Sequence, residues 1–134
     1  MIVNGVQLPD PDTADVLFME KLEREQDIVT KAASNHAGKT RAQIIRSQCE
    51  AIFKFFDNVF GEGTAKTIFG EKVNLILCVE SYEQALTEID RLDVEQAAAL
   101  RAKYVSKYPK TNGKKKKSKK KRYNNYKPKL QVKK

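Results

Sequence analysis

The clearest pattern of apolar and polar positions lies between residues 40 and 60, where apolar side chains recur at three- and four-residue spacing. This spacing predicts an amphipathic helix. Thr40 and Gln43 stand in a capping-box arrangement at its start, and Gly61 is suited to end it. At about 100° per residue, the apolar positions fill roughly half of the helical circumference, more than a surface helix needs. We therefore expect this helix to be covered from two sides and to form the core. Its predicted apolar half comprises Ile44, Ile45, Cys49, Ile52, Phe53, Phe55, Phe56, Val59 and Phe60, and its polar half includes Ala51.

The segments on either side of this helix are also predicted to be helical. Asp12 is the expected N-cap of a first helix that continues to about Ala33, and Glu25 interrupts the apolar face of that helix. A short helix capped by Thr64 is expected within residues 62–72.

Two more helices are predicted after residue 73, separated near residue 92. Asn74 is the expected N-cap of the first, and its apolar side between Leu75 and Ile89 should face inward. Asp93 and Gln96 repeat the capping-box pattern, so a last helix should begin there and continue to about Lys107.

The first eight residues are apolar with Asn4-Gly5 in their middle, a dipeptide suited to a tight hairpin turn. We expect a short hairpin or an edge strand, with a disordered lead-in as the alternative. The predicted fold class is all-α: a compact bundle of four main helices plus one short helix, preceded by a short N-terminal hairpin or strand.

Charge divides the chain into two parts. The 134 residues include 26 Lys and Arg and 17 Asp and Glu, a formal net charge of +9. Residues 1–108 hold 13 basic and all 17 acidic residues, a net charge of −4, whereas residues 109–134 hold 13 basic residues and no acidic one. The second part has too few apolar residues to offset the entropy of ordering. We predict a helical domain over residues 1–108 and a disordered Lys-rich tail over residues 109–134.

Several classes of protein are not expected. The first residues lack the basic start and apolar run of a secretory signal. The longest apolar run, Leu75–Val79, is far shorter than the roughly 20 residues that cross a bilayer. Cys49 and Cys78 are too few for a disulfide scaffold, which favours a reducing cytoplasm. We therefore expect neither export nor a membrane partner.

No arrangement of residues argues for an enzyme. His36 has no companion histidine and is expected in a surface loop, while Cys49 and Cys78 fall on apolar helical faces and are expected in the core, even in contact. The glycines and the Lys-Thr pair within residues 61–67 match the spacing of neither the P-loop nor the dinucleotide fingerprint. We expect no catalytic residue, no cofactor and no metal site.

The candidate binding residues lie in the basic tail. Its lysines could neutralise phosphates, and its tyrosines could stack on bases. The same composition suits an acidic protein surface, or serves only to keep an assembling protein soluble, and these alternatives stay open. The candidates are Lys114, Lys115, Lys116, Lys117, Lys119, Lys120, Lys121, Arg122, Tyr123 and Tyr126.

The central part of the chain carries a family resemblance over about residues 12–108. The residues that carry it are Gln48–Phe53, Phe55–Asp57, Val59–Thr64, Ile68–Gly70, Asn74, Leu75 and Cys78. They resemble a family of small proteins from phages and prophages of Gram-positive bacteria, which is similar in size and placement to siphophage tail assembly chaperones. The lysine run of this chain is longer than in that family, which leaves the role of the tail open.

The resemblance implies a non-catalytic protein of the host cytoplasm that is not part of the mature virion. Such a chaperone binds the tape measure protein, keeps it soluble and helps to recruit tail tube subunits. The resemblance also implies that a longer form can be made by ribosomal frameshifting, for which A-rich lysine codons would provide a slippery run. The alternative function is nucleic-acid binding through the Lys-rich arm.

Self-association is a further expectation. Four apolar residues lie off the main stripes of their helices and are candidates for an exposed contact face. They are Val16, Met19, Ile76 and Leu77.

Overall fold

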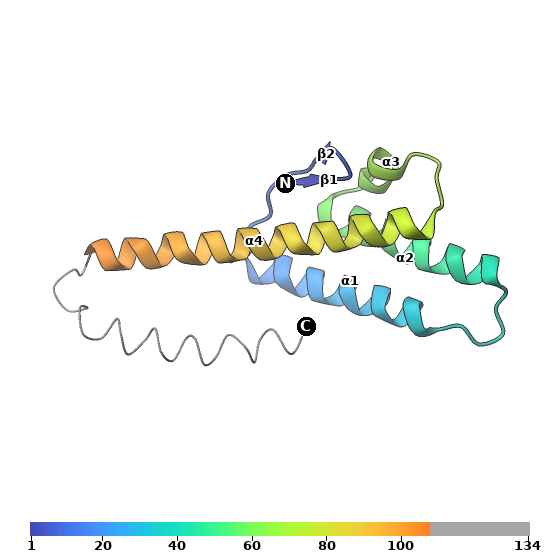
Figure 1. The fold of residues 1–134 in the computed structure, drawn as a ribbon. Helices are drawn as coiled ribbons and strands as arrows, with labels where there is room; N and C mark the ends of the chain where they lie inside the picture. Colours follow the sequence, from blue (N-terminus) through green and yellow to red (C-terminus); the bar gives the residue numbers. More distant parts are fainter. Residues whose placement is uncertain (108–134) are drawn as a thin grey trace. The chain divides into compact units, whose positions relative to one another are not determined.

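The computed structural model describes residues 1–107 of the chain, and the main elements are helices (Figure 1). The all-α class and the N-terminal hairpin are confirmed. The chain separates into two units, Met1–Gln96 and Ala97–Lys134, of which the second is described only as far as Lys107. The predicted domain boundary after residue 108 lies outside the described residues and stays a prediction. The elements are β1 (Ile2–Val3), β2 (Val6–Gln7), α1 (Val16–Ser34), α2 (Arg41–Phe60), α3 (Thr64–Phe69) and α4 (Leu75–Lys107).

The N-terminal hairpin is an ordered part of the first unit. β1 and β2 pair antiparallel, with Val3 opposite Val6, and the turn residues Asn4 and Gly5 have φ angles of 50° and 76°. Positive φ at both positions is what a type I′ turn requires, and glycine adopts it without a steric cost. Val3 and Leu8 are buried in the core. The hairpin is therefore stabilised by tertiary burial, because so short a hairpin would not be stable alone.

Helix α2 is the centre of the core, as its pattern predicts. The Thr40 hydroxyl accepts a hydrogen bond from the Gln43 amide (3.2 Å), and the Gln43 side chain accepts one from the Thr40 amide (2.9 Å), so the capping box is confirmed. Gly61 follows the helix with a φ of 119°. Ala51 is buried, although the sequence pattern placed it on the polar half of the helix. The buried arc is wider than the pattern indicates because α2 packs against α1, α3 and Tyr82 of α4.

Aromatic rings join α2 to its neighbours. Phe55 is fully buried and lies edge-on to Tyr82 of α4, with 4.9 Å between the ring centroids. Phe56 is also fully buried and contacts Phe69 of α3 at 5.7 Å. Such edge-to-face pairs stabilise a core beyond the burial of their area. The predicted inward face of Leu75–Ile89 is confirmed, because Cys78, Ala85 and Ile89 of this face are buried.

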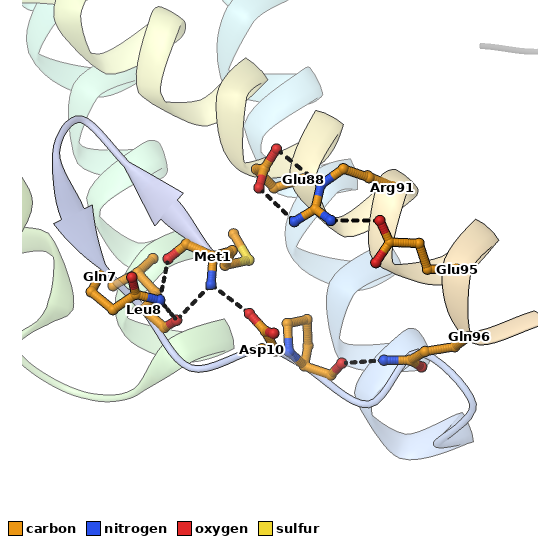
Figure 2. Close-up of polar contacts among 9 residues, drawn as sticks. Met1, Gln7, Leu8, Asp10, Glu88, Arg91, Glu95 and Gln96 are labelled. Atoms are coloured by element: carbon orange, nitrogen blue, oxygen red, sulfur yellow. Dashed lines mark hydrogen bonds and ion pairs between the residues drawn. The ribbon is translucent and has the colours of Figure 1, made fainter. Parts of the chain in front are cut away.

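The predicted break near residue 92 is wrong, because α4 is one helix of 33 residues. Arg91 bridges Glu88 (2.9 Å) and Glu95 (2.7 Å) across the expected boundary (Figure 2). Ion pairs at this spacing stabilise a continuous helix. The Gln96 side chain, expected to reach back to Asp93, instead donates to the Pro11 carbonyl (3.1 Å). Within residues 1–107, the structure has three long helices and one short helix in place of the predicted four and one.

Two predicted N-caps are also wrong. Asp15, not Asp12, caps α1 by accepting from the Leu17 amide (3.1 Å), because residues 12–15 form a separate turn in which Asp12 accepts from the Ala14 amide. Helix α3 has Gly63 rather than Thr64 at its N-cap, and the Asp57 carboxylate of α2 accepts from the amide at its second position. A side chain from a neighbouring helix thus replaces the local cap. The expected cap of α4 is confirmed, because the Asn74 side chain accepts from the Leu77 amide (3.0 Å).

The segment between the hairpin and α1 is held by polar contacts at both ends (Figure 2). The Met1 ammonium donates to the Leu8 carbonyl (2.9 Å) and forms an ion pair with Asp10. At the other end, Thr13 is buried and its amide and hydroxyl both donate to the Gln96 side chain, at 3.1 Å and 2.7 Å. These contacts fix the path of the chain over α4.

Candidate binding surface

The candidate residues of the basic tail all lie outside the described part of the chain. These are Lys114–Lys117, Lys119–Arg122, Tyr123 and Tyr126. Their role in binding nucleic acid or an acidic protein surface stays a prediction.

The two cysteines are buried side by side. Cys49 of α2 and Cys78 of α4 are both fully buried, and their thiols lie close enough for Cys49 to affect the pKa of Cys78. Burial, strengthened by the neighbouring Cys49, raises the pKa of the Cys78 thiol to about 12. A thiol that stays protonated and inaccessible behaves as a small apolar side chain. The expectation that both cysteines lie in the core, in contact with each other, is confirmed.

The other side chains that could take part in catalysis or metal binding show no such arrangement among the described residues. His36 is exposed, and its ring lies 3.3 Å from the Gln48 side chain. Glu25 is only 7% exposed between the buried Leu22 and Val29, so the interruption of the apolar face of α1 is accommodated inside the fold. Among residues 1–107, no group of three His, Cys, Asp or Glu side chains is placed to hold a metal ion. No helix in the same range has the length and apolar content to cross a membrane.

A hollow of about 430 Å³ lies beside the first turns of α4. Asn4 of the hairpin turn forms one wall, because its amide donates to the Gln84 side chain (2.8 Å) and its own side chain donates to the Ile68 carbonyl (3.1 Å). These two bonds join the hairpin turn to α4 and to the end of α3. The other lining residues come from α4 and are Leu77, Glu80, Ser81, Glu83, Gln84 and Thr87.

The hollow is rich in hydrogen-bond acceptors. Glu80 and Glu83 are exposed, and neither forms an ion pair or hydrogen bond with another described residue. Ser81 is only 2% exposed and has no described hydrogen-bond partner. Every fully buried side-chain oxygen or nitrogen of the described residues has a hydrogen-bond partner. The Ser81 hydroxyl therefore keeps some contact with solvent, and Ser81 is one of the residues that line the hollow. Two carboxylates and a hydroxyl beside the apolar Leu77 are groups that could accept hydrogen bonds from a cationic side chain with an aliphatic stem.

The four apolar residues predicted for an exposed face divide into two pairs. Val16 and Ile76 are 65% and 70% exposed, as predicted. Met19 and Leu77 are partly buried and pack against the core, so that part of the prediction is wrong. Helical periodicity alone could not distinguish the exposed pair from the partly buried pair, because packing against neighbouring elements buries residues beyond the apolar stripe of each helix.

The family comparison covers almost the whole chain. Residues 4–126 match the family of unknown function DUF6673. The chain belongs to this family. No curated protein and no solved structure matches it.

The part matched to the DUF6673 family includes both the hollow and the predicted basic binding residues. The sequence pattern did not predict the hollow. Glu80, Glu83 and Thr87 are three and four residues apart, which indicates from the sequence that they share one side of α4. The contribution of Asn4 had no such signal, because it lies 80 residues from Gln84 in the chain.

Proposed function

We propose that this DUF6673 protein acts by binding other proteins, without catalysis, as a siphophage tail assembly chaperone in the host cytoplasm. Its partners in this proposal are the tape measure protein and the tail tube subunit. The resemblance of the α2–α4 region to small phage and prophage proteins supports the specific role. The described fold supports the general one, because the residues that carry the resemblance build a closed aromatic core.

The observation that carries the proposal is the exposure of Ile76 at the beginning of α4. Ile76 is 70% exposed, and Val73 just before the helix is 40% exposed. Ile76 lies one turn before Glu80, so it shares a side of α4 with the acidic rim of the hollow. An apolar side chain beside unpaired polar groups is suited to hold an amphipathic helix of a partner.

The test is co-purification of the full chain with its tape measure protein. The gene of a tape measure protein is expected as a very long open reading frame immediately downstream. Ile76→Asp should reduce the recovery of the complex, whereas Ile28→Asp, which changes an exposed isoleucine of α1, should not. Equal loss in both variants, or no complex with the wild-type chain, would reject the proposal.

Nucleic-acid binding through the Lys-rich tail is the competing outcome of the same work. Changing Lys114–Lys117 to Gln should leave the tape measure complex intact if the chaperone proposal is right. If that change instead removes binding of the full chain to DNA or RNA at physiological salt, and no tape measure complex forms, the nucleic-acid function is favoured.

A further inference from the structure

The hollow beside α4 carries two carboxylates that no described residue pairs. The buried Ser81, whose hydroxyl has no described partner, lines the same hollow, as does the apolar Leu77. The other carboxylates on the following turns are partly committed, since Glu88 and Glu95 both pair with Arg91. Unpaired carboxylates beside an enclosed hydroxyl point to a ligand that donates several hydrogen bonds and carries positive charge.

The best complement to this site within the chain is its lysine-rich segment. Residues 114–122 include eight Lys or Arg and no acidic residue. Residues 1–96, the first unit, hold 10 basic and 17 acidic residues, a net charge of −7. A lysine side chain offers three ammonium donors on an aliphatic stem that can lie along Leu77. Both partners of the contact lie within the range matched to the family.

We propose that the hollow beside α4 binds the Lys114–Lys117 segment of a second copy of this chain. The hollow is lined by the first turns of α4, whereas Lys114 follows the last residue of α4 by seven positions. A second copy supplies the segment without requiring its chain to double back along α4. The ammonium group of one lysine lies between Glu80 and Glu83, and the Ser81 hydroxyl accepts a further hydrogen bond.

This contact joins two different surfaces, so it is heterologous. Each copy has one hollow and one lysine segment. In a pair joined by one such contact, one copy keeps its hollow and the other keeps its lysine segment, so either end can bind a further copy. Copies therefore add head to tail, and the assembly grows with protein concentration. Because the attraction is between charges at the protein surface, added salt weakens it. The inference does not depend on the chaperone proposal, since self-association and binding of a tape measure protein are measured separately.

Sedimentation of the full chain at low salt tests the site with matched variants. Glu80→Gln with Glu83→Gln should raise the dissociation constant of self-association about tenfold or more, because two charge-assisted contacts are lost. The control is Glu20→Gln with Glu23→Gln, which changes two exposed glutamates of the same spacing on α1 and alters the net charge equally. This control should leave the dissociation constant within about twofold, a difference of well under the 1.4 kcal/mol that corresponds to a tenfold change.

The lysine side of the contact has its own control. Changing Lys114–Lys117 to Gln should weaken self-association as much as the change in the hollow. The same change at Lys127, Lys129, Lys133 and Lys134 removes equal charge and should have a smaller effect. A mixture of the hollow variant and the Lys114–Lys117 variant retains one intact hollow and one intact segment, so it should form a one-to-one complex that does not grow further.

Three outcomes would overturn the inference. The first is a wild-type chain that stays monomeric at low salt, and the second is self-association that the hollow variant leaves unchanged while circular dichroism shows a native fold. The third comes from carbodiimide crosslinking of mixed isotopically light and heavy copies. Amide bonds between Glu80 or Glu83 and the lysine segment are expected between a light and a heavy chain, and crosslinks confined to one chain would exclude the second copy as the source.

Discussion

The contact between Gln96 and the segment before α1 is the sharpest test of the fold, because sequence and structure assign Gln96 opposite roles. The capping-box pattern makes Gln96 the partner of Asp93 at the start of a separate helix. In the structure, Gln96 lies inside α4 and forms three hydrogen bonds with Pro11 and Thr13. Substitutions at Gln96 and Asp93 therefore have different expected effects in the two cases.

The magnitude follows from the three bonds. Gln96→Ala removes two bonds from Thr13, which is only 7% exposed, and one to the Pro11 carbonyl. At about 0.5–1.5 kcal/mol per net hydrogen bond, and less a few tenths for the better helix propensity of alanine, the loss is about 1–4 kcal/mol. Asp93→Ala removes an exposed side chain from a helix interior and should be neutral or slightly stabilising. If Asp93 were an N-cap, the same change would cost about 0.5–2 kcal/mol.

Urea unfolding followed by circular dichroism is the suitable assay, with the slope of the transition checked for constancy between variants. Gln26→Ala is the control, because Gln26 is a half-buried glutamine of α1 with no described hydrogen bond. Gln96→Ala should also lower the melting temperature, by roughly 4–8 °C per kcal/mol for a domain of this size. A stable Gln96→Ala protein together with a destabilised Asp93→Ala protein would refute the continuous α4.

Three further predictions concern the core and the chain start. Phe55→Ala should destabilise the protein by about 3–5 kcal/mol in urea unfolding, because it removes a fully buried ring that contacts Tyr82. The free energy of unfolding should fall as pH rises above about 9, because burial raises the pKa of Cys78 to about 12 and the thiolate forms readily only in the unfolded chain. Urea midpoints measured across this pH range should show a shallower fall for Cys78→Ala. Asp10→Asn should cost about 0.5–1 kcal/mol in thermal unfolding, because the Met1 ammonium loses its charged partner while the Asp10 side chain itself is exposed.

Each of these predictions has a control that isolates its cause. Ile28→Ala removes a large apolar side chain that is 45% exposed and should cost much less than Phe55→Ala. Tyr82 has a pKa raised by burial as well, so Tyr82→Phe should reduce the alkaline loss that Cys78→Ala leaves. Asp27→Asn breaks an exposed pair with Lys31 and should have little effect. Equal effects of Phe55→Ala and Ile28→Ala, or of Asp10→Asn and Asp27→Asn, would show that the named contact is not the cause.

The exposed pair of Glu88 and Arg91 contributes to stability with a pH dependence opposite to that of the buried Cys78. The hydrogen bond from Arg91 lowers the pKa of Glu88. Its contribution to stability is therefore present above the unfolded pKa and is lost as the pH falls through the folded pKa. Both side chains are solvent-accessible, so the contribution of the pair is small and screened by salt.

Much of the fold was accessible from the sequence because its causes are local. The capping box at Thr40, the turn at Asn4-Gly5 and the cap at Asn74 each depend on residues within a few positions of one another. The apolar half of α2 was also readable, because helical periodicity reports which side chains share a face. For the same reason the sequence determined an all-α body with an aromatic centre and a separate, strongly basic chain end.

Tertiary contacts decided what these local signals could not. Gln96 has a good capping pattern in sequence, yet its partners are Thr13 and Pro11, more than 80 residues earlier. The Asp57 carboxylate takes over the cap of α3, and Asn4 closes the hollow against Gln84. A local pattern records only which bonds a side chain can form, whereas the folded chain determines which donors and acceptors come within reach. The binding hollow on α4 therefore exists only in the tertiary structure, although most of its residues are neighbours on one helix.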